Sequence, residues 1–150
     1  MGRVDSPARL RKLPSWLSAQ VAHSGARLVN EALGEVGMRR HHFAVLTALA
    51  EAGATSQAEL GRRLWIDRSD LHAVLNELER RDWIARVRDA RDRRRNLVEL
   101  TPSGAETLRD LDARVDAAQD ALLAPLSASE RRQLVALLTR LVTAERSTSP

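Results

Sequence analysis

The sequence predicts a mainly α-helical fold with a small β-wing: a winged helix-turn-helix lobe between long N- and C-terminal helices. Three observations lead to this prediction. Apolar residues recur every three or four positions along most of the 150 residues, two short helical stretches meet at a tight turn, and two short strand-like stretches follow at once. Hydrophobic residues make up 43% of the chain and aromatic residues only 3%, so the expected core is Leu, Val and Ala, which favours helices.

The composition limits the class of protein. A chain of this length is expected to form one domain, residues 1–150. The absence of cysteine excludes disulfides, thiolate metal sites and thiol-based redox switches. No apolar run approaches the ~20 residues that cross a membrane, and the N-terminal stretch lacks the apolar segment of a signal peptide. We therefore expect a cytoplasmic protein with no membrane partner.

The first long helix is expected over residues 10–33, after nine residues that we expect to be disordered. Its apolar stripe consists of Leu10, Leu13, Leu17, Val21, Ser24, Leu28 and Ala32. Pro14 marks a break near the start of the main helix, and Gly34 and Gly37 end it. Its weak amphipathicity suits a surface that another chain covers.

Two helices are expected next. The first runs from Met38 to Ala52 and ends at Gly53. Its inward-facing residues are expected to be Phe43, Leu46, Leu49 and Ala50. The capping box Ser56–Glu59 then starts a short helix over Gln57–Leu64, which ends at Trp65-Ile66.

A third helix of this group is expected over Arg68–Arg81, capped by Asp67. Its core positions are Leu71, Val74, Leu75 and Leu78. Two short helices that meet at a three- or four-residue turn form a helix-turn-helix, whose second helix can enter a major groove. The outward face consists of Arg68, Ser69, Asp70, His72, Ala73 and Asn76. These side chains could read base edges, or they could simply form a solvated face.

The stretch after this helix favours the first reading. Strands are expected over Ile84–Arg88 and Asn96–Thr101, joined by a charged tip, Asp89–Arg95. Residues 80–95 contain eight arginines and three aspartates, a local charge of +5, whereas the whole chain carries +4. A basic hairpin directly after a helix indicates a wing that lies against nucleic acid. Its candidate contacts are Arg86, Arg91, Asp92, Arg93, Arg94 and Arg95.

Two helices are expected at the C-terminal end. Thr101 caps the first, which begins at Pro102 and runs to Ala124. Its heptad-like seam consists of Leu108, Leu111, Val115, Ala118 and Leu122. A second capping box, Ser127–Glu130, opens the last helix, and residues 147–150 are expected to be frayed. The two helices could close as an intramolecular hairpin, but we favour pairing with a second copy, because the terminal helices hold more apolar surface than so small a domain could cover.

These patterns resemble the MarR family of winged helix-turn-helix transcription regulators, over roughly residues 10–142. The most specific part is Asp92-Arg-Arg-Arg-Asn-Leu-Val-Glu-Leu-Thr-Pro-Ser-Gly104, which is similar to the family's wing. Supporting stretches are residues 57–60 and residues 67–79. The resemblance implies that residues 10–34 and 102–146 form dimerisation helices and residues 38–101 a DNA-binding lobe. No Gly-rich phosphate loop, Ser/His/Asp set or paired catalytic carboxylate stands out in the sequence, so the chain is not expected to be an enzyme.

The resemblance also assigns roles to single residues. Arg94 would be the wing arginine that enters the minor groove, and Asp92 would orient it by a charge-assisted hydrogen bond. The recognition helix would be the one that carries the outward face above. Asp70 departs from a groove-facing pattern, since an acid repels phosphates; it could accept from a cytosine amino group or pair with Arg68.

Members of the family often bind a small phenolic or other aromatic anion between the dimerisation helices and the DNA-binding lobe. The matching candidates here are Trp16, His23, Arg27, His41, His42 and Phe43. The alternative is packing for the aromatic rings and inter-helix hydrogen bonds for the histidines. Trp65 and Trp83 are expected in the core. No two of the four histidines have an i, i+4 spacing, so neither a metal nor another cofactor is expected.

The leading hypothesis is a homodimeric regulator that binds double-stranded DNA. It would be a repressor, released from a pseudo-palindromic operator by a small ligand. The alternatives are a helical protein-interaction module and a nonspecific architectural DNA-binding protein. The operator, the ligand and the regulated genes cannot be inferred from the sequence.

Overall fold

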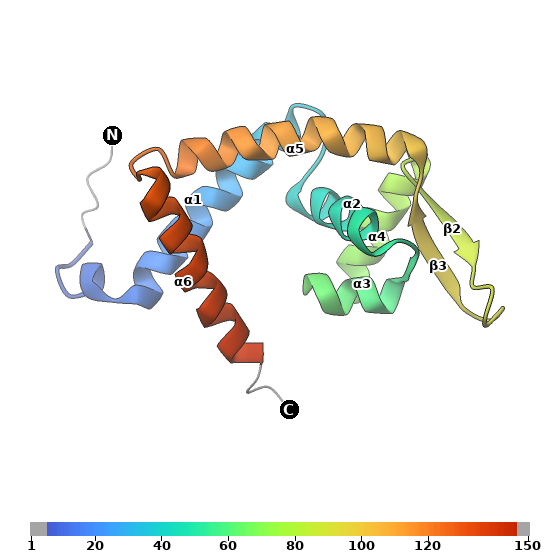
Figure 1. The fold of residues 1–150 in the computed structure, drawn as a ribbon, viewed down its shortest axis with the longest axis horizontal. Coiled ribbons are helices and arrows are strands. Elements are labelled where there is room, and N and C mark those ends of the chain that lie inside the picture. Colours follow the sequence, from blue (N-terminus) through green and yellow to red (C-terminus); the bar gives the residue numbers. More distant parts are fainter. Residues whose placement is uncertain (1–5, 147–150) are drawn as a thin grey trace.

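Long helices and a smaller lobe of short helices and strands lie side by side in this chain (Figure 1). The structure, a computed structural model, describes residues 6–146, so the expectations for residues 1–5 and 147–150 lie outside it. The elements are η1 (Leu10–Lys12), α1 (Pro14–Gly34), α2 (Arg40–Ala52), β1 (Thr55–Ser56), α3 (Gln57–Leu64), α4 (Arg68–Arg80), β2 (Ile84–Arg88), β3 (Asn96–Leu100), α5 (Pro102–Leu122) and α6 (Ala128–Arg146). The predicted class, mainly helical with a small wing, is confirmed. The expected disorder of residues 6–9 is wrong, because the carbonyl of Pro7 accepts from the amide of Leu10 at 2.9 Å and leads the chain into η1.

The lobe is built around leucines from α2, α3 and α4. Among its fully buried side chains are Leu46, Leu49, Leu60, Leu71, Leu75, Leu78 and Ile84. On α2 the expectation fails for Ala50, which is exposed, whereas Val45 and Ala48 are buried. The buried face of α2 is wider than one stripe, because α3, α4 and α5 all pack against this helix.

The wing belongs to a three-stranded antiparallel sheet with the order β1-β3-β2. Arg86 of β2 lies opposite Val98 of β3, and Thr55 of β1 lies opposite the same valine on the other side. Two strands had been expected. The third, β1, has only two residues, too few to show the alternation that marks a strand in a sequence.

The predicted helix starts are confirmed by their hydrogen bonds. The Oγ of Ser56 accepts from the amide of Glu59 at 3.2 Å, and the Oγ1 of Thr101 accepts from the amide of Gly104 at 3.0 Å. The second capping box is complete: Glu130 accepts from the amide of Ser127 at 2.8 Å, and the Ser127 hydroxyl accepts from the amide of Glu130 at 3.3 Å. The amide of Ser127 holds the pKa of Glu130 below its usual value.

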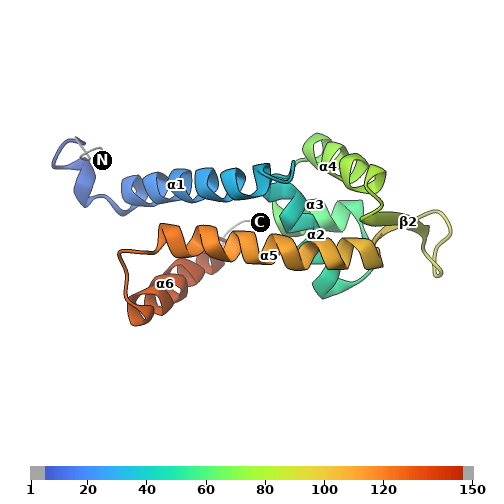
Figure 2. The same ribbon diagram turned by 90° about the horizontal axis from the view of Figure 1, so that it is seen from above.

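The seam of α5 is largely covered within the chain. Leu108, Leu111 and Ala118 are buried, and α5 runs beside α1 in both ribbon views (Figures 1 and 2). By contrast, α6 turns away after Pro125, so α5 and α6 do not close along their length as a hairpin. Large apolar side chains remain exposed on α1 and α6: Leu17, Val21, Val135, Leu137, Leu138, Leu141 and Val142. No helix of residues 6–146 is long and apolar enough to cross a membrane.

Candidate nucleic-acid interface

A three-residue turn, residues 65–67, connects α3 to α4. Trp65 ends α3 in a left-handed conformation, with φ of 56°. Asp67 then caps α4, because its Oδ1 accepts from the amides of Ser69 and Asp70, both at 2.9 Å. The amide of Asp70 and the hydroxyl of Ser69 lower the pKa of the Asp67 carboxyl. The helix therefore begins sharply, with its first turn exposed.

Helix α4 has one buried and one exposed face, as predicted. Its core positions Leu71, Val74, Leu75 and Leu78 are buried. The predicted outward positions Arg68, Ser69, Asp70, His72 and Ala73 are exposed, and Asn76 is half-buried. The hydroxyl of Ser69 donates to Asp67 at 2.8 Å, so toward another molecule it is left to accept a hydrogen bond.

The exposed start of α4 and the wing share one hollow of about 1260 Å³. Helix α4 contributes Arg68, Ser69 and His72, and the wing contributes Arg94, Arg95 and Asn96. The start of α3 adds Ser56, Gln57 and Ala58, which had not been predicted as site residues. The Ser56 capping box could have indicated them, since a helix N-terminus offers free amides to a phosphate. The structure thus brings the two predicted DNA-binding segments onto one concave surface.

Two aspartates shape the wing tip through backbone amides. Asp89 accepts from the amide of Arg91 at 2.8 Å, and Asp92 accepts from the amide of Arg94 at 3.0 Å. The expected contact of the Asp92 carboxylate was with the Arg94 guanidinium. The carboxylate binds the amide two residues ahead, the usual local bond of aspartate in turns. The four tip arginines, Arg91, Arg93, Arg94 and Arg95, are exposed.

Arg86 was predicted as a DNA contact together with the tip arginines, but its environment differs from theirs. Its guanidinium turns toward α4, where Nη2 donates to Oδ1 of Asn76 at 2.9 Å and Nη1 pairs with Glu79. Its side chain is 28% exposed. The structure therefore gives Arg86 partners within the chain at the base of the wing.

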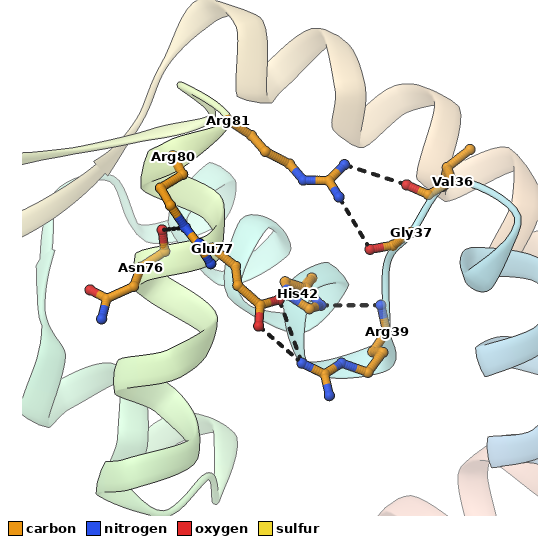
Figure 3. A network of polar contacts seen from close by, with 8 residues as sticks. All are labelled: Val36, Gly37, Arg39, His42, Asn76, Glu77, Arg80 and Arg81. Carbon is orange, nitrogen blue, oxygen red and sulfur yellow. Dashed lines mark hydrogen bonds and ion pairs between the residues drawn. The ribbon is translucent and has the colours of Figure 1, made fainter.

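A buried polar contact joins α2 to Glu77 of α4, the residue after Asn76 (Figure 3). His42 is 1% exposed, and its Nε2 lies 2.6 Å from Oε2 of Glu77. Because its Nδ1 accepts from the amide of Arg39 at 3.1 Å, the ring hydrogen lies on Nε2 and is donated to Glu77. Burial lowers the pKa of His42, and the bond from His42 lowers the pKa of Glu77. Arg39 also reaches the Glu77 carboxylate, at 3.3 Å.

The same figure shows how α4 meets the linker between α1 and α2. Arg81, which directly follows α4, donates to the carbonyls of Val36 and Gly37, each at 3.5 Å. Its guanidinium also lies 5.1 Å from the ring centroid of Trp83. The end of α4 is thus tied to the segment that leads from the long helix α1 into the lobe.

The six predicted ligand residues are not gathered in one cavity. Both ring nitrogens of His42 are occupied by the bonds above, and Arg27 pairs with Glu31 at 2.8 Å on the surface of α1. His23 is exposed, and His41 is half-buried. Phe43 lines a separate hollow of about 840 Å³ between α2 and the end of α3. Trp16 is half-buried, and its Nε1 is buried without a hydrogen-bond partner among the described residues.

The two remaining tryptophans differ in their environment. Trp83 packs against the core, as predicted. The prediction for Trp65 is wrong, because its side chain is 68% exposed. The left-handed backbone at the end of α3 turns Trp65 out of that helix's buried face. Within residues 6–146, no group of three or more His, Asp or Glu side chains could hold a metal ion.

The turn, the exposed recognition face and the basic hairpin define a winged helix-turn-helix protein of the DNA-binding type. A model described as MarR family matches residues 36–95. The chain belongs to the MarR family, as predicted, and has the fold of solved transcriptional regulators that are 32–33% identical to it in sequence. Because this is a family of transcription regulators, the prediction that the chain is not an enzyme is confirmed.

Three similar proteins illustrate the relationship. The HTH-type transcriptional repressor NicR of Pseudomonas putida is 33% identical over 103 residues, which cover 67% of this chain and 63% of NicR. The PcaV regulator of Streptomyces coelicolor, solved with its natural ligand, is 32% identical with a TM-score of 0.77, over 97% of this chain and 99% of that one. A MarR mutant from E. coli complexed with operator DNA is 28% identical with a TM-score of 0.77, over 91% and 99%. The chain spans 60–64% of the length of three curated relatives, NicR among them.

Proposed function

We propose that this protein is a transcriptional repressor that binds a pseudo-palindromic operator as a homodimer in the cytoplasm. The observation that carries the proposal is the shared concave surface, which holds the exposed start of α4 and the wing arginines Arg94 and Arg95. A helix N-terminus of this kind fits a major groove, and a cationic fork beside it fits the adjacent minor groove. Operator binding by the related E. coli MarR mutant supports this assignment.

The exposed apolar side chains of α1 and α6 support the dimer. Leu17 and Val21 lie on α1, and Leu138 and Leu141 lie on α6, all more than two fifths exposed. Burying such side chains is worth about 1.5–3 kcal/mol each when complete. A second copy would cover them with the same surfaces of its own and would place two recognition helices about one helical turn of DNA apart, ~10 bp.

We further propose that a small aromatic anion releases the protein from DNA. The support is the complex of PcaV with its natural ligand, together with the buried Nε1 of Trp16, a donor without a partner among the described residues. Trp16, His23, Arg27, His41 and Phe43 remain the candidate contacts, although they do not share one cavity within this chain, whereas His42 already uses both ring nitrogens. The ligand must bind better to a dimer whose lobes no longer match the operator spacing.

The test is a salt series of binding to the DNA that flanks the protein's own gene, against a scrambled duplex of equal length. A preference of ~10³-fold or more at physiological salt supports a specific regulator. Arg94→Ala should weaken operator binding by about 1–3 kcal/mol. Arg109→Ala, which removes an exposed arginine of α5 outside the concave surface, is the matched control and should leave binding unchanged. Equal, steeply salt-dependent binding to both duplexes would reject the proposal and leave only attraction to the DNA backbone.

A further inference from the structure

Arg86 occupies a position where a core residue would be expected. It faces the same side of the sheet as Val98, its partner across the strands, and as Ile84 two residues earlier on β2. Val98 and Ile84 are both buried. An arginine on this face has to keep its guanidinium supplied with acceptors, since an unpaired buried charge is costly. The placement of Arg86 on the inner face of the sheet therefore depends on acceptors supplied by neighbouring elements.

The acceptors come from the recognition helix. Asn76 and Glu79 lie three residues apart, on neighbouring turns of α4. Arg86, on strand β2 of the wing, contacts both of them. Nη2 meets Oδ1 of Asn76 at 2.9 Å, and Nη1 meets the Glu79 carboxylate. This bridge fixes the base of the wing against the second half of α4.

The bridge also determines the orientation of the Asn76 carboxamide. A guanidinium has donors only, so the amide must turn its oxygen toward Arg86 and its amino group away. In Figure 3 the Asn76 side chain projects away from the His42–Glu77 contact. No described residue accepts a hydrogen bond from its amino group. Asn76 lies on the outward stripe with Ser69 and His72, at steps of three and four residues.

We propose that Arg86 is a positioning residue for operator recognition. It presents the Asn76 amino group as a hydrogen-bond donor to an acceptor on the DNA, and it does not contact the DNA itself. The acceptor is either a phosphate oxygen or an oxygen or nitrogen atom on a base edge, such as guanine O6 or N7 or thymine O4. The inference rests on the proposed function and names one contact of the proposed interface.

A double-mutant cycle tests the coupling between the two residues. Arg86→Met keeps the apolar stem and removes the donors, and Asn76→Ala removes the presented amide. Each single substitution should weaken operator binding roughly tenfold, which is about the contribution of one hydrogen bond. The double variant should be no weaker than either single variant, because the arginine acts through the asparagine. Losses that multiply to about a hundredfold would overturn the proposal.

The salt dependence separates positioning from direct contact. The slope of log affinity against log salt should fall by about one in Arg94→Ala and stay unchanged in Arg86→Met. Arg86→Gln also removes the charge and covers the case in which the Met variant does not fold; its amide nitrogen ends two bonds short of the arginine Nη2, so the bond to Asn76 is lost here as well. It should keep the wild-type slope and, like Arg86→Met, weaken binding roughly tenfold. A slope lowered by about one in either Arg86 variant would show a direct phosphate contact and refute the assignment.

The choice of duplex identifies the acceptor. An Asn76→Ala loss on operator and scrambled DNA alike indicates a phosphate, and a loss on the operator alone indicates a base edge. The wild-type preference between the two duplexes is measured first. If it is absent, the proposed specific function fails, but the slopes of the Arg86 variants can still be read on either duplex and decide the role of Arg86.

Discussion

Gly104 lies where the wing returns to the long helices, and replacing it by alanine should destabilise the protein. It is buried in the first turn of α5, directly above the carbonyl of Trp83. A Cβ built there would overlap the Trp83 carbonyl oxygen and would lie 2.8 Å from Cδ1 of Leu100. The carbonyl cannot move freely, because it accepts from the amide of Thr101 at 3.1 Å. The hydroxyl of Thr101 in turn donates to the carbonyl of Asp82 at 2.6 Å.

The magnitude follows from two opposing effects. Alanine is favoured over glycine in a helix by about 1 kcal/mol. Overpacking typically costs about 1–3 kcal/mol, and a clash with backbone belongs at the upper end of that range. The net loss for Gly104→Ala should therefore be about 2 kcal/mol, which for a chain of this size corresponds to a fall in Tm of about 4–8 °C.

The assay is thermal and urea unfolding of the wild type, Gly104→Ala and a matched control. Gly34→Ala is the control, because a Cβ at the last residue of α1 meets nothing within 4 Å. Its stability should be unchanged or higher by up to about 1 kcal/mol. If Gly104→Ala were as stable as Gly34→Ala, the packing of α5 on the base of the wing would not be as tight as described.

Two further predictions concern stability in acid and the dimer. Burial lowers the pKa of His42 below its ordinary value of 6.5, so the unfolded chain takes up a proton that the folded chain resists. The contribution of neutral His42 to the free energy of unfolding should be fully present above pH 6.5 and should be lost as the pH falls below that value. Because the pKa of Glu77 is also lowered, its contribution should be lost as well when the pH falls below its ordinary pKa of 4.5. A urea midpoint that does not change between pH 7.5 and 5.5 would contradict the prediction for His42. Leu138→Asp should weaken the proposed homodimer more than tenfold, because it would bury an unpaired charge. Sedimentation should show monomers at concentrations where Gln133→Asp, a change at an exposed polar position of the same helix, remains a dimer.

The sequence predicted the elements whose signals are local. The capping residues Ser56, Asp67 and Thr101 start their helices where expected, because each cap is a bond between residues two or three positions apart. The buried leucines of α4 follow its period, since a helix repeats its inward face every three or four residues. The charged tip had to lie outside the core. These relationships hold whatever packs against the element.

The tertiary structure alone decided the partners of each side chain. Arg86 was counted with the wing arginines because charge is visible in a sequence, but its direction depends on Asn76 of α4, ten residues away. His42 was predicted to contact a ligand, but in the structure its ring hydrogen is donated to Glu77, 35 residues away in the sequence. The seam of α5 read as a dimer contact, although α1 and the lobe cover much of it. Periodicity and charge record how buried or how polar a position is, whereas its neighbours are set by contacts between segments far apart in the chain.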